Sequence, residues 1–483
     1  MSAPAVAARV GGAKEKLGLL GKSERTSGRR GTGAASPAQL VQEHYRCPES
    51  FLQVELHGTL SQEAGYFRFG ADCIGYGRST VGATRRQADG RLTDLSSEAR
   101  GRAGALQLPF DPSEVIENLR RERYAHARGG VEDALRKLYY GLRPLLSPAM
   151  RKRVQQFHAL GWKHRTFPRW PVDTTVETLS EKLMLLALQA RGVEKIPFVW
   201  FWPEGARGCI AMTHDVETEA GRDFCGQLMD IDDAAGIKAA FQIVPEDRYP
   251  VPAEFLESLR GRGFEIGVQD LNHDGRLFDE RQEFLRRAGV INRHARAYGA
   301  RGFRAGVLYR NPEWYDALDF SYDMSMPNVA HLDPQRGGCC TVFPYFIGDI
   351  LEIPVTTVQD YTLFQLVHDH SIDLWKKQLE IILAKNGMAS FIVHPDYVIE
   401  DEPQRVYREL LAHLEELRPR ENLWTALPAE INDWWRQRDQ MSVVEAGGSL
   451  HIEGPGAERA VLAFATQKQG KLVYEVAGGA RQA

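Results

Sequence analysis

The sequence has few cysteines and no long apolar run. Its six cysteines form no CxxC pair, the spacing typical of zinc sites and redox dithiols, so we interpret them as reduced structural thiols. No window approaches ~18 uninterrupted apolar residues, the minimum for a membrane span. The N-terminus, residues 1–22, is interrupted by Gly and Lys before an apolar core of signal-peptide length appears. We therefore expect a soluble, cytoplasmic protein with no membrane span.

The chain also lacks a large excess of charge of either sign. A formal net charge of -4 at pH 7 argues against nucleic acid as a partner held by bulk electrostatics, although it leaves local basic patches open. Aromatic residues are scarce in residues 1–40, which are rich in Gly, Ala, Ser, Lys and Arg. Such a segment buries too little surface to offset the entropy of ordering. We predict a disordered tail there.

The rest of the composition is that of a globular protein with several regions. Hydrophobic residues make up 43% of the chain, enough for large cores. Residues 41–202 contain two strong helical patterns, at 111–124 and 173–192, and are predicted to form an accessory region that is α/β or mostly helical. Residues 437–483 alternate apolar and polar positions between Gly-rich turns, which predicts a small β appendage.

Residues 203–436 show a different sequence pattern, in which short apolar strands alternate with amphipathic helices. Repeated β/α units imply parallel strands with helices outside. Seven such units suit a closed barrel better than an open sheet, so the predicted fold class is α/β, a β/α barrel with outer helices. The seven strand candidates are 209–215, 239–244, 264–269, 302–306, 320–325, 351–357 and 389–395.

Polar residues gather where these strands end, and a barrel of this kind carries its active site at the carboxyl ends of its strands. Because strands buried in a parallel barrel are normally apolar, we predict that these residues share one site. His214 alternates with Asp215 and should point to the opposite face, where a packing or supporting role fits best. The residues concerned are Asp215 and Glu217, Gln269 and His273, Arg304, Asp323, and His394.

Five short motifs occur in order along the same region. Together they resemble the polysaccharide deacetylase family, that is, the NodB-homology domain of carbohydrate esterase family four. The resemblance covers about residues 205–400 and implies a distorted seven-stranded β/α barrel. The motifs are "THDVE" at 213, "QDLNH" at 269, "RAG" at 304, "YDMS" at 322 and "IVHP" at 392.

The resemblance implies a hydrolase that removes N-acetyl groups from a glycan or glycan precursor with the help of a divalent metal, usually zinc. In that family the metal polarises the carbonyl and lowers the pKa of its bound water. By position, Asp215 resembles the general base, Arg304 the group that orients the base, and His394 the general acid. The implied metal ligands are Glu217, His273 and Gln269, and the fourth motif places Tyr322 and Asp323 at the substrate.

Four positions depart from the family pattern, one of them Val216, which stands where T-F-D-D members carry the metal aspartate. Gln269 stands where the family has a histidine, and an amide oxygen is a poor zinc ligand beside imidazole. Glu217 is a methylene longer than the expected aspartate, and Gly306 replaces a proline. The expected result is zinc that is weakly bound or absent, or another metal, for which Asp270 and Asp274 could supply oxygen ligands.

Two main hypotheses follow. The first is a metal-dependent deacetylase acting on a carbohydrate substrate, favoured by Asp215, Arg304 and His394. The second is a non-catalytic barrel that binds carbohydrate or a partner protein, favoured by Gln269. Hydrolysis of a non-sugar amide stays open, because a fold does not fix its substrate. Trp314 and Tyr345 are either sugar-stacking surface or core.

Overall fold

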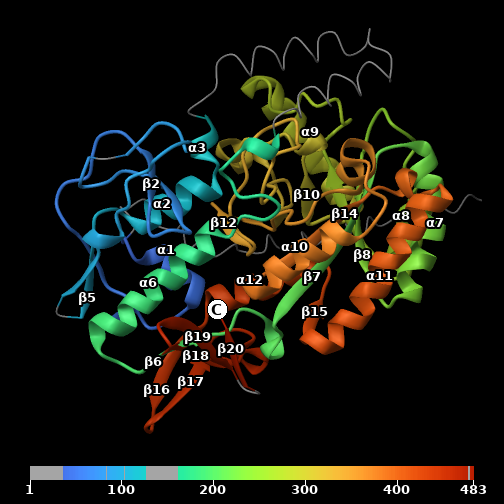
Figure 1. Cartoon of the computed structure of the whole chain (residues 1–483). Helices are drawn as coiled ribbons and strands as arrows, with labels where there is room; N and C mark the ends of the chain where they lie inside the picture. The colour runs from blue at the N-terminus through green and yellow to red at the C-terminus, as the bar shows by residue number, and fades with distance from the viewer. Residues whose placement is uncertain (1–35, 83, 103, 127–161, 477–478, 483) are drawn as a thin grey trace, which may run out of the picture. The chain divides into compact units, whose positions relative to one another are not determined.

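Seven parallel strands build the central sheet of the computed structural model, at the positions expected from the sequence (Figure 1). Their order is β14-β7-β8-β9-β10-β11-β13. All nine residues of β7 are buried, which explains its apolar sequence up to the polar residues at its end. The strands are β7 (Gly208–Val216), β8 (Ala239–Ile243), β9 (Glu265–Gln269), β10 (Gly302–Arg304), β11 (Tyr322–Asp323), β13 (Ile350–Glu352) and β14 (Met388–Val393).

The prediction of a closed seven-stranded barrel needs correction. Two further strands join the sheet: β12 (Tyr345–Ile347) pairs antiparallel with β13, and β15 (Leu423–Thr425) pairs parallel with β7. Between β13 and β14 no strand ladder forms among the described residues. Thr356 and Thr357 bridge this seam instead, and the hydroxyl of Thr356 accepts a hydrogen bond from the Ser390 amide at 2.9 Å. One backbone hydrogen bond, from the Thr357 amide to the Ser390 carbonyl at 3.3 Å, also crosses the seam. Because these few bonds replace a ladder, the sheet curls without closing as a continuous strand pairing.

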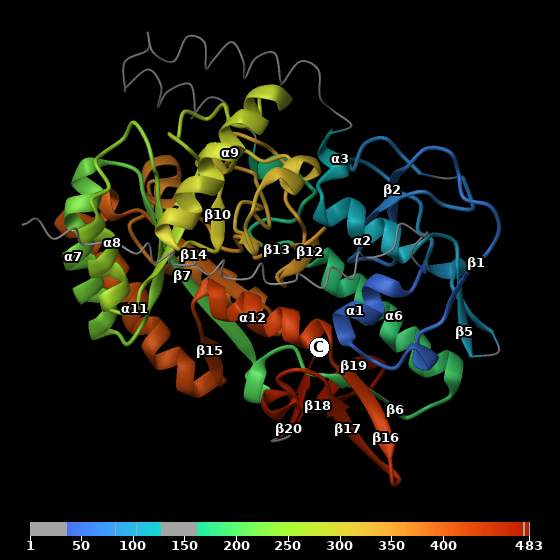
Figure 2. The same cartoon turned by 180° about the vertical axis from the view of Figure 1, so that it is seen from behind.

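Helices cover the outside of the curled sheet. Figures 1 and 2 both show α7, α8 and α11 beside β7 and β8, as expected for β/α units. Thr218 caps α7 by accepting a hydrogen bond from the Gly221 amide at 3.1 Å, immediately after the polar end of β7. The helices are α7 (Glu219–Ala234), α8 (Ala253–Gly261), α9 (Arg281–Tyr298), α10 (Asp373–Ala384), α11 (Asp401–Glu421) and α12 (Pro428–Asp439).

The N-terminal region combines helices with short strands. The structure describes residues 36–82, 84–102, 104–126, 162–476 and 479–482, so most of the predicted tail, residues 1–35, lies outside the described residues. Asp111 caps α2 through the amides of Ser113 and Glu114, as its sequence pattern predicts. The elements are α1 (Gln39–Tyr45), β1 (Val54–Leu56), β2 (Gly65–Arg68), β3 (Ile74–Gly77), β4 (Arg100–Arg102), β5 (Ala105–Leu108), α2 (Pro112–Arg120), α3 (Arg123–His126), α6 (Thr175–Arg191) and β6 (Lys195–Val199).

The C-terminal strands do not stand alone. β18 pairs antiparallel with β6, so residues assigned above to separate regions share one sheet, in the order β20-β19-β18-β6. The apolar residues Ile196 and Phe198 of β6 are fully buried in this pairing. The strands are β16 (Ser442–Ala446), β17 (Ser449–Glu453), β18 (Leu462–Lys468), β19 (Lys471–Val476) and β20 (Gly479–Gln482).

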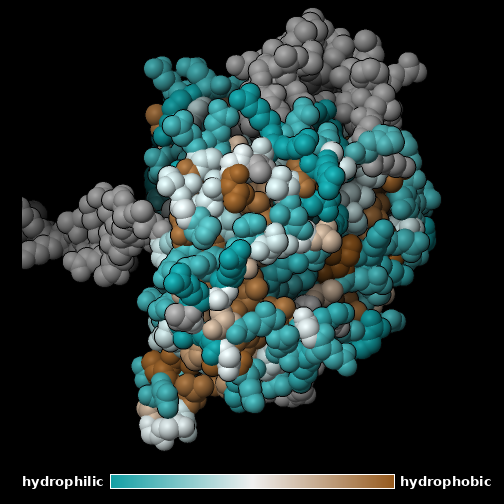
Figure 3. Space-filling view, turned by 60° about the vertical axis from the view of Figure 1, so that its left-hand side comes forward, coloured by the Kyte–Doolittle hydropathy of each residue, from teal (hydrophilic) through white to brown (hydrophobic). Residues whose placement is uncertain are grey.

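Apolar character is limited both along the described helices and on the face drawn in Figure 3. Among the described helices, none combines the length and apolar character needed to cross a membrane. On the face in Figure 3, hydrophobic residues form small separate groups among hydrophilic ones. That face therefore lacks the continuous apolar surface that marks large docking sites.

A buried carboxyl group on α6 gives the fold a pH dependence. Glu177 accepts hydrogen bonds from the hydroxyl of Thr341 and the amide of Val342, and burial raises its pKa to about 7. The folded state therefore keeps a proton that the unfolded chain releases above its ordinary pKa. We expect this residue's contribution to stability to fall by roughly 2–3 kcal/mol as pH rises from about 4.5 to about 7.

Urea unfolding at several pH values tests this expectation. Glu177→Gln removes the titration and keeps the shape, so the wild type should lose stability relative to the variant across that pH range. Parallel stability curves for the two proteins would contradict it.

Candidate active site

Asp215 and Arg304 form a buried ion pair at the carboxyl ends of β7 and β10. Arg304 Nη1 lies 2.6 Å from Asp215 Oδ1 and also donates to the hydroxyl of Thr213 at 2.9 Å. Burial raises the pKa of Asp215, and the nearby Arg304 and His394 oppose this only in part. A raised pKa makes the carboxylate a better proton acceptor. Arg304 is placed to orient Asp215, as the sequence predicts.

His394 follows β14 and is held by Asp360, a residue that the sequence analysis missed. Asp360 Oδ1 lies 2.6 Å from His394 Nδ1, and Oδ2 accepts the backbone amide of the same histidine at 2.7 Å. Burial lowers the pKa of His394, but Asp360 and Glu217 outweigh it and raise the pKa well above its usual value. In the sequence, Asp360 is a carboxylate in "TTVQD", three residues after the predicted strand 351–357, although β13 itself ends at Glu352. A carboxylate shortly after a predicted strand is a signal from which Asp360 could have been identified.

Glu217 lies between these two pairs, and three side-chain nitrogens converge on it. Its Oε1 lies 2.8 Å from His273 Nε2, 3.0 Å from Gln269 Nε2 and 3.5 Å from His394 Nε2. Burial raises the pKa of Glu217, but the two histidines outweigh it and hold the pKa well below its usual range. The extra methylene of this glutamate therefore brings a charged oxygen to the centre of the group.

The predicted ligand set Glu217, His273 and Gln269 does not fit a metal ion in this arrangement. Gln269 turns its amide nitrogen toward the carboxylates and donates to both Asp215 and Glu217. Arg248 Nη2 lies 3.2 Å from His273 Nδ1. The Nε2 atom of His273, which would have to bind the ion, lies 2.8 Å from Glu217 Oε1 and is paired with that carboxylate instead.

A different set of ligand atoms is better placed. One oxygen each from Asp215 and Glu217 and one nitrogen of His394 lie within 4.8 Å of one another. Carboxylates and imidazole are ligands for zinc and for other divalent ions. The bond from His394 Nδ1 to Asp360 also matches the support that metal-binding histidines receive in proteins. This group could hold a metal ion, and of the predicted ligands it contains only Glu217.

The departure at Gly306 is explained by close packing around His273. A Cβ atom at Gly306 would lie 2.6 Å from Asp270 Oδ2 and 3.0 Å from His273 Cδ2, so the proline of the family pattern would not fit here. Asp270 and His273 both have positive φ, at 55° and 54°, a strained conformation that is common at functional sites. Asp274, the other predicted oxygen donor, is paired with Arg287 at 2.9 Å.

His214 points away from this group, as strand alternation predicts. Its Nε2 lies 2.9 Å from Asp232 on α7, and Asp232 also accepts a hydrogen bond from the hydroxyl of Tyr407 on α11 at 2.5 Å. All three side chains are buried. This network ties β7 to two outer helices and leaves the other face of the strand to Asp215.

Tyr322 and Asp323 are not brought to the group around Glu217. Tyr322 is fully buried, pairs with Gly302 at the start of β10, and bonds to Glu265 at the start of β9. It therefore lies at the end of the sheet opposite Asp215. Asp323 is buried and bonds to Ser325. Their predicted contact with substrate has no support in this placement.

Comparisons with known proteins give remote likenesses. No family model and no curated protein matches the chain. A solved structure assigned to the polysaccharide deacetylases, from Mycobacterium smegmatis, is 19% identical, with 49% of this chain and 93% of that chain covered and a TM-score of 0.41. A family 4 acetyl xylan esterase from Clostridium thermocellum, in complex with cobalt, is 13% identical, with 47% and 91% covered and a TM-score of 0.29.

A third solved structure is a mutant of a CE4 family pseudoenzyme. It is 14% identical, with 48% of this chain and 68% of that chain covered and a TM-score of 0.30. All three cover about half of this chain. Because these likenesses are remote, the functional proposal rests on the side chains described above.

Proposed function

We propose that this chain is a hydrolase that removes acetyl groups from the amino groups of a glycan or glycan precursor. One observation carries the proposal: two oriented pairs, Asp215 with Arg304 and His394 with Asp360, lie on either side of Glu217. Amide hydrolysis needs a base to activate water and an acid to protonate the leaving amine. A cleft used only for binding has no need of two such pairs.

Each pair carries out one proton transfer of the hydrolysis. Arg304 fixes one oxygen of Asp215 and leaves Oδ2 to take a proton from water; among the described residues, Oδ2 accepts only from the neutral Gln269 amide. Asp360 holds His394 by a charge-assisted bond at Nδ1, which stabilises the imidazolium and leaves Nε2 to donate. His394 Nε2 lies 3.5 Å from Glu217 Oε1, and Asp215 Oδ2 is joined to the same glutamate oxygen through the Gln269 amide.

Metal dependence is part of the proposal. Glu217, with Asp215 and His394 close beside it, would hold a divalent ion, zinc by preference, which would polarise the acyl carbonyl when bound. An imidazole cannot bind an ion and donate a proton through the same nitrogen. With His394 and Asp215 assigned to proton transfer, Glu217 carries most of the binding. We therefore expect weak binding and substoichiometric zinc after purification.

The second candidate function is a barrel that binds carbohydrate or a partner without catalysis. Gln269 favours it, because one neutral amide satisfies an oxygen of both Asp215 and Glu217 and thereby stabilises the two carboxylates in the absence of an ion.

His394→Gln tests the proposed acid directly. The variant keeps a polar side chain but cannot carry the transferred proton, so release of acetate from an oligosaccharide of N-acetylglucosamine should fall by ~100-fold or more. His413→Gln makes the same change at a partly exposed position on α11 and should leave the rate unchanged. Equal rates for wild type and His394→Gln would remove this residue from the mechanism.

A further inference from the structure

Two carboxyl groups that the proposed mechanism does not use lie next to each other in the sheet. Asp323 on β11 and Glu352 on β13 are partners in the parallel pairing of these strands, and both side chains are buried. Among the described residues, no arginine, lysine or histidine forms an ion pair with either of them. Because two neighbouring carboxylates cannot both keep their charge in a buried site, this carboxyl pair holds one proton.

The shared proton resides on Glu352. Burial, and then the charge of Asp323, raise the pKa of Glu352 well above its usual value, and Glu352 bonds to Asp323. The titratable groups that face the carboxyl pair from other segments, Tyr315, Cys339 and Tyr345, are neutral near pH 7 because burial raises the pKa of each. Tyr345, a candidate for either sugar-stacking surface or core, is buried here and belongs to the core.

The carboxyl pair fixes the turn that follows β11. Asp323 accepts two hydrogen bonds from Ser325, at 3.1 Å from the backbone amide and at 2.7 Å from the hydroxyl. Glu352 accepts the backbone amide of Met326 at 3.0 Å. Each carboxyl group therefore holds a different part of the same turn.

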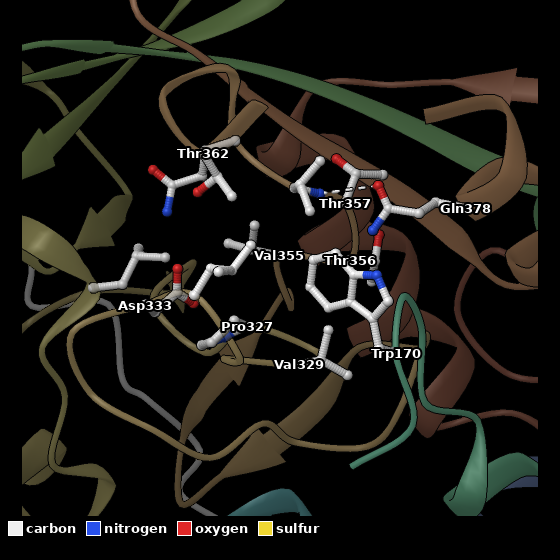
Figure 4. A pocket seen from close by; sticks show the side chains of 13 residues that line it. Trp170, Pro327, Val329, Asp333, Val355, Thr356, Thr357, Thr362 and Gln378 are labelled. Atoms are coloured by element: carbon white, nitrogen blue, oxygen red, sulfur yellow. Dashed lines mark hydrogen bonds between the residues drawn. The ribbon is translucent and has the colours of Figure 1, made fainter. Parts of the chain in front are cut away.

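The far end of this turn is anchored separately, to the chain beyond β13. Pro327 and Val355 form a parallel β-bridge and lie side by side in Figure 4. The amide of Val355 donates to the carbonyl of Met326 at 2.9 Å, and its carbonyl accepts the amide of Asn328 at 2.7 Å. The near end, residues 323–325, depends instead on the carboxyl pair.

Arg304 is held by the near end of the turn. Its Nε donates to the carbonyl of Met324 at 3.1 Å, and its Nη2 lies 3.8 Å from the sulfur of that methionine. The hydroxyl of Ser325 accepts the amide of Ala305, the next residue in the chain, at 2.8 Å. Nη1 of the same guanidinium meets Asp215 at 2.6 Å. A shift of the turn would therefore move the guanidinium relative to the carboxylate that it orients.

We propose that Asp323 and Glu352 share one proton and form a positioning pair, which fixes Arg304 against Asp215 through residues 324 and 325. Neither carboxyl group touches a reacting atom. The fourth motif, "YDMS", thereby gains a role behind the site in place of the predicted contact with substrate. The inference rests on the proposed function for the role of Asp215 as the base, whereas the contacts to Arg304 can be tested without any turnover.

A double-mutant cycle between Ser325 and Arg304 tests the positioning. Ser325→Ala removes the hydroxyl that accepts the Ala305 amide, and Arg304→Lys removes the Nε donor. Because both changes act on one network, their combined effect on the unfolding equilibrium constant, measured in urea, should differ from the product of the single effects by ~3-fold or more. Ser180→Ala, the same change at a buried serine on α6, should show no such coupling to Arg304→Lys.

In an active protein, the variants should separate turnover from substrate binding. Ser325→Ala should lower kcat by ~10-fold and leave KM within about 2-fold, because a misplaced group slows the reaction without removing a contact to substrate. Asp323→Asn should do the same. Glu352→Gln, whose amide replaces the protonated carboxyl group, should stay within about 3-fold of wild type, and Ser180→Ala should change neither constant.

The outcomes separate this inference from the proposed function. Independent effects of Ser325→Ala and Arg304→Lys on unfolding would overturn the positioning role, whether or not the protein releases acetate. Coupling in a protein that releases no acetate would uphold the positioning of Arg304 and refute the hydrolase. A loss of activity in Glu352→Gln as large as that in Asp323→Asn would overturn the shared proton.

Discussion

Asp215→Asn is expected to lower the rate of acetate release by ~100-fold to 10,000-fold, because asparagine cannot take the proton from water. It is also expected to destabilise the fold. Arg304 is fully buried, and the substitution leaves its charge without the carboxylate that lies 2.6 Å away. Removing one partner of a buried ion pair costs about 3–5 kcal/mol, and the remaining bonds of Arg304 to Thr213 and Met324 place this case at the lower end.

The two effects can be separated with a matched variant. Asp232→Asn removes a buried carboxylate on the other face of β7, where it supports His214 and Tyr407. It should also destabilise the protein yet leave acetate release unchanged when both variants are assayed well below their Tm. If Asp215→Asn keeps its activity, or if both variants lose it equally, Asp215 is not the base.

Gln269→His is expected to raise zinc affinity by ~100-fold. It places an imidazole nitrogen beside Glu217, where wild-type Gln269 points an N–H group, and changes to groups that only support metal ligands already alter affinity by ~10 to 100-fold. Zinc affinity is measured by competition with a chromogenic chelator, alongside acetate release with zinc, cobalt, manganese and no added metal. Gln404→His on α11 controls for histidines outside the group.

The response of activity decides what Gln269 does. If Gln269→His releases acetate and the wild type does not, the natural protein is a barrel that binds without catalysis. If the variant binds zinc better but releases acetate more slowly than the wild type, Gln269 contributes to catalysis in an altered active site. If zinc affinity does not rise, the assignment of "QDLNH" to the metal motif is wrong.

Strand alternation explains how much of the site the sequence could predict. Asp215, Gln269 and Arg304 end parallel strands, so their side chains meet, and His214 has to face the helices. The α/β pattern was equally readable from the alternation of apolar strands and amphipathic helices.

Contacts that depend on how the sheet curls could not be predicted in this way. Asp360 reaches His394 only because the segment after β13 crosses the open seam beside β14. His273 is also contacted by Arg248, from a loop after β8, whose Nη2 lies 3.2 Å from His273 Nδ1. Tyr322 sits in the right motif, but its strand contains two residues, and its side chain lies at the end of the sheet opposite Asp215.

Acetate release by the wild-type protein, measured before and after treatment with a chelator, distinguishes a metal-dependent deacetylase from a non-catalytic barrel. With an oligosaccharide of N-acetylglucosamine as substrate, the proposal predicts slow release that rises on addition of zinc or another divalent ion, falls after chelation, and returns when the ion is restored. Failure to release acetate with zinc, cobalt, manganese or no added ion, by a protein that is folded and binds the oligosaccharide, would contradict it and favour the non-catalytic barrel.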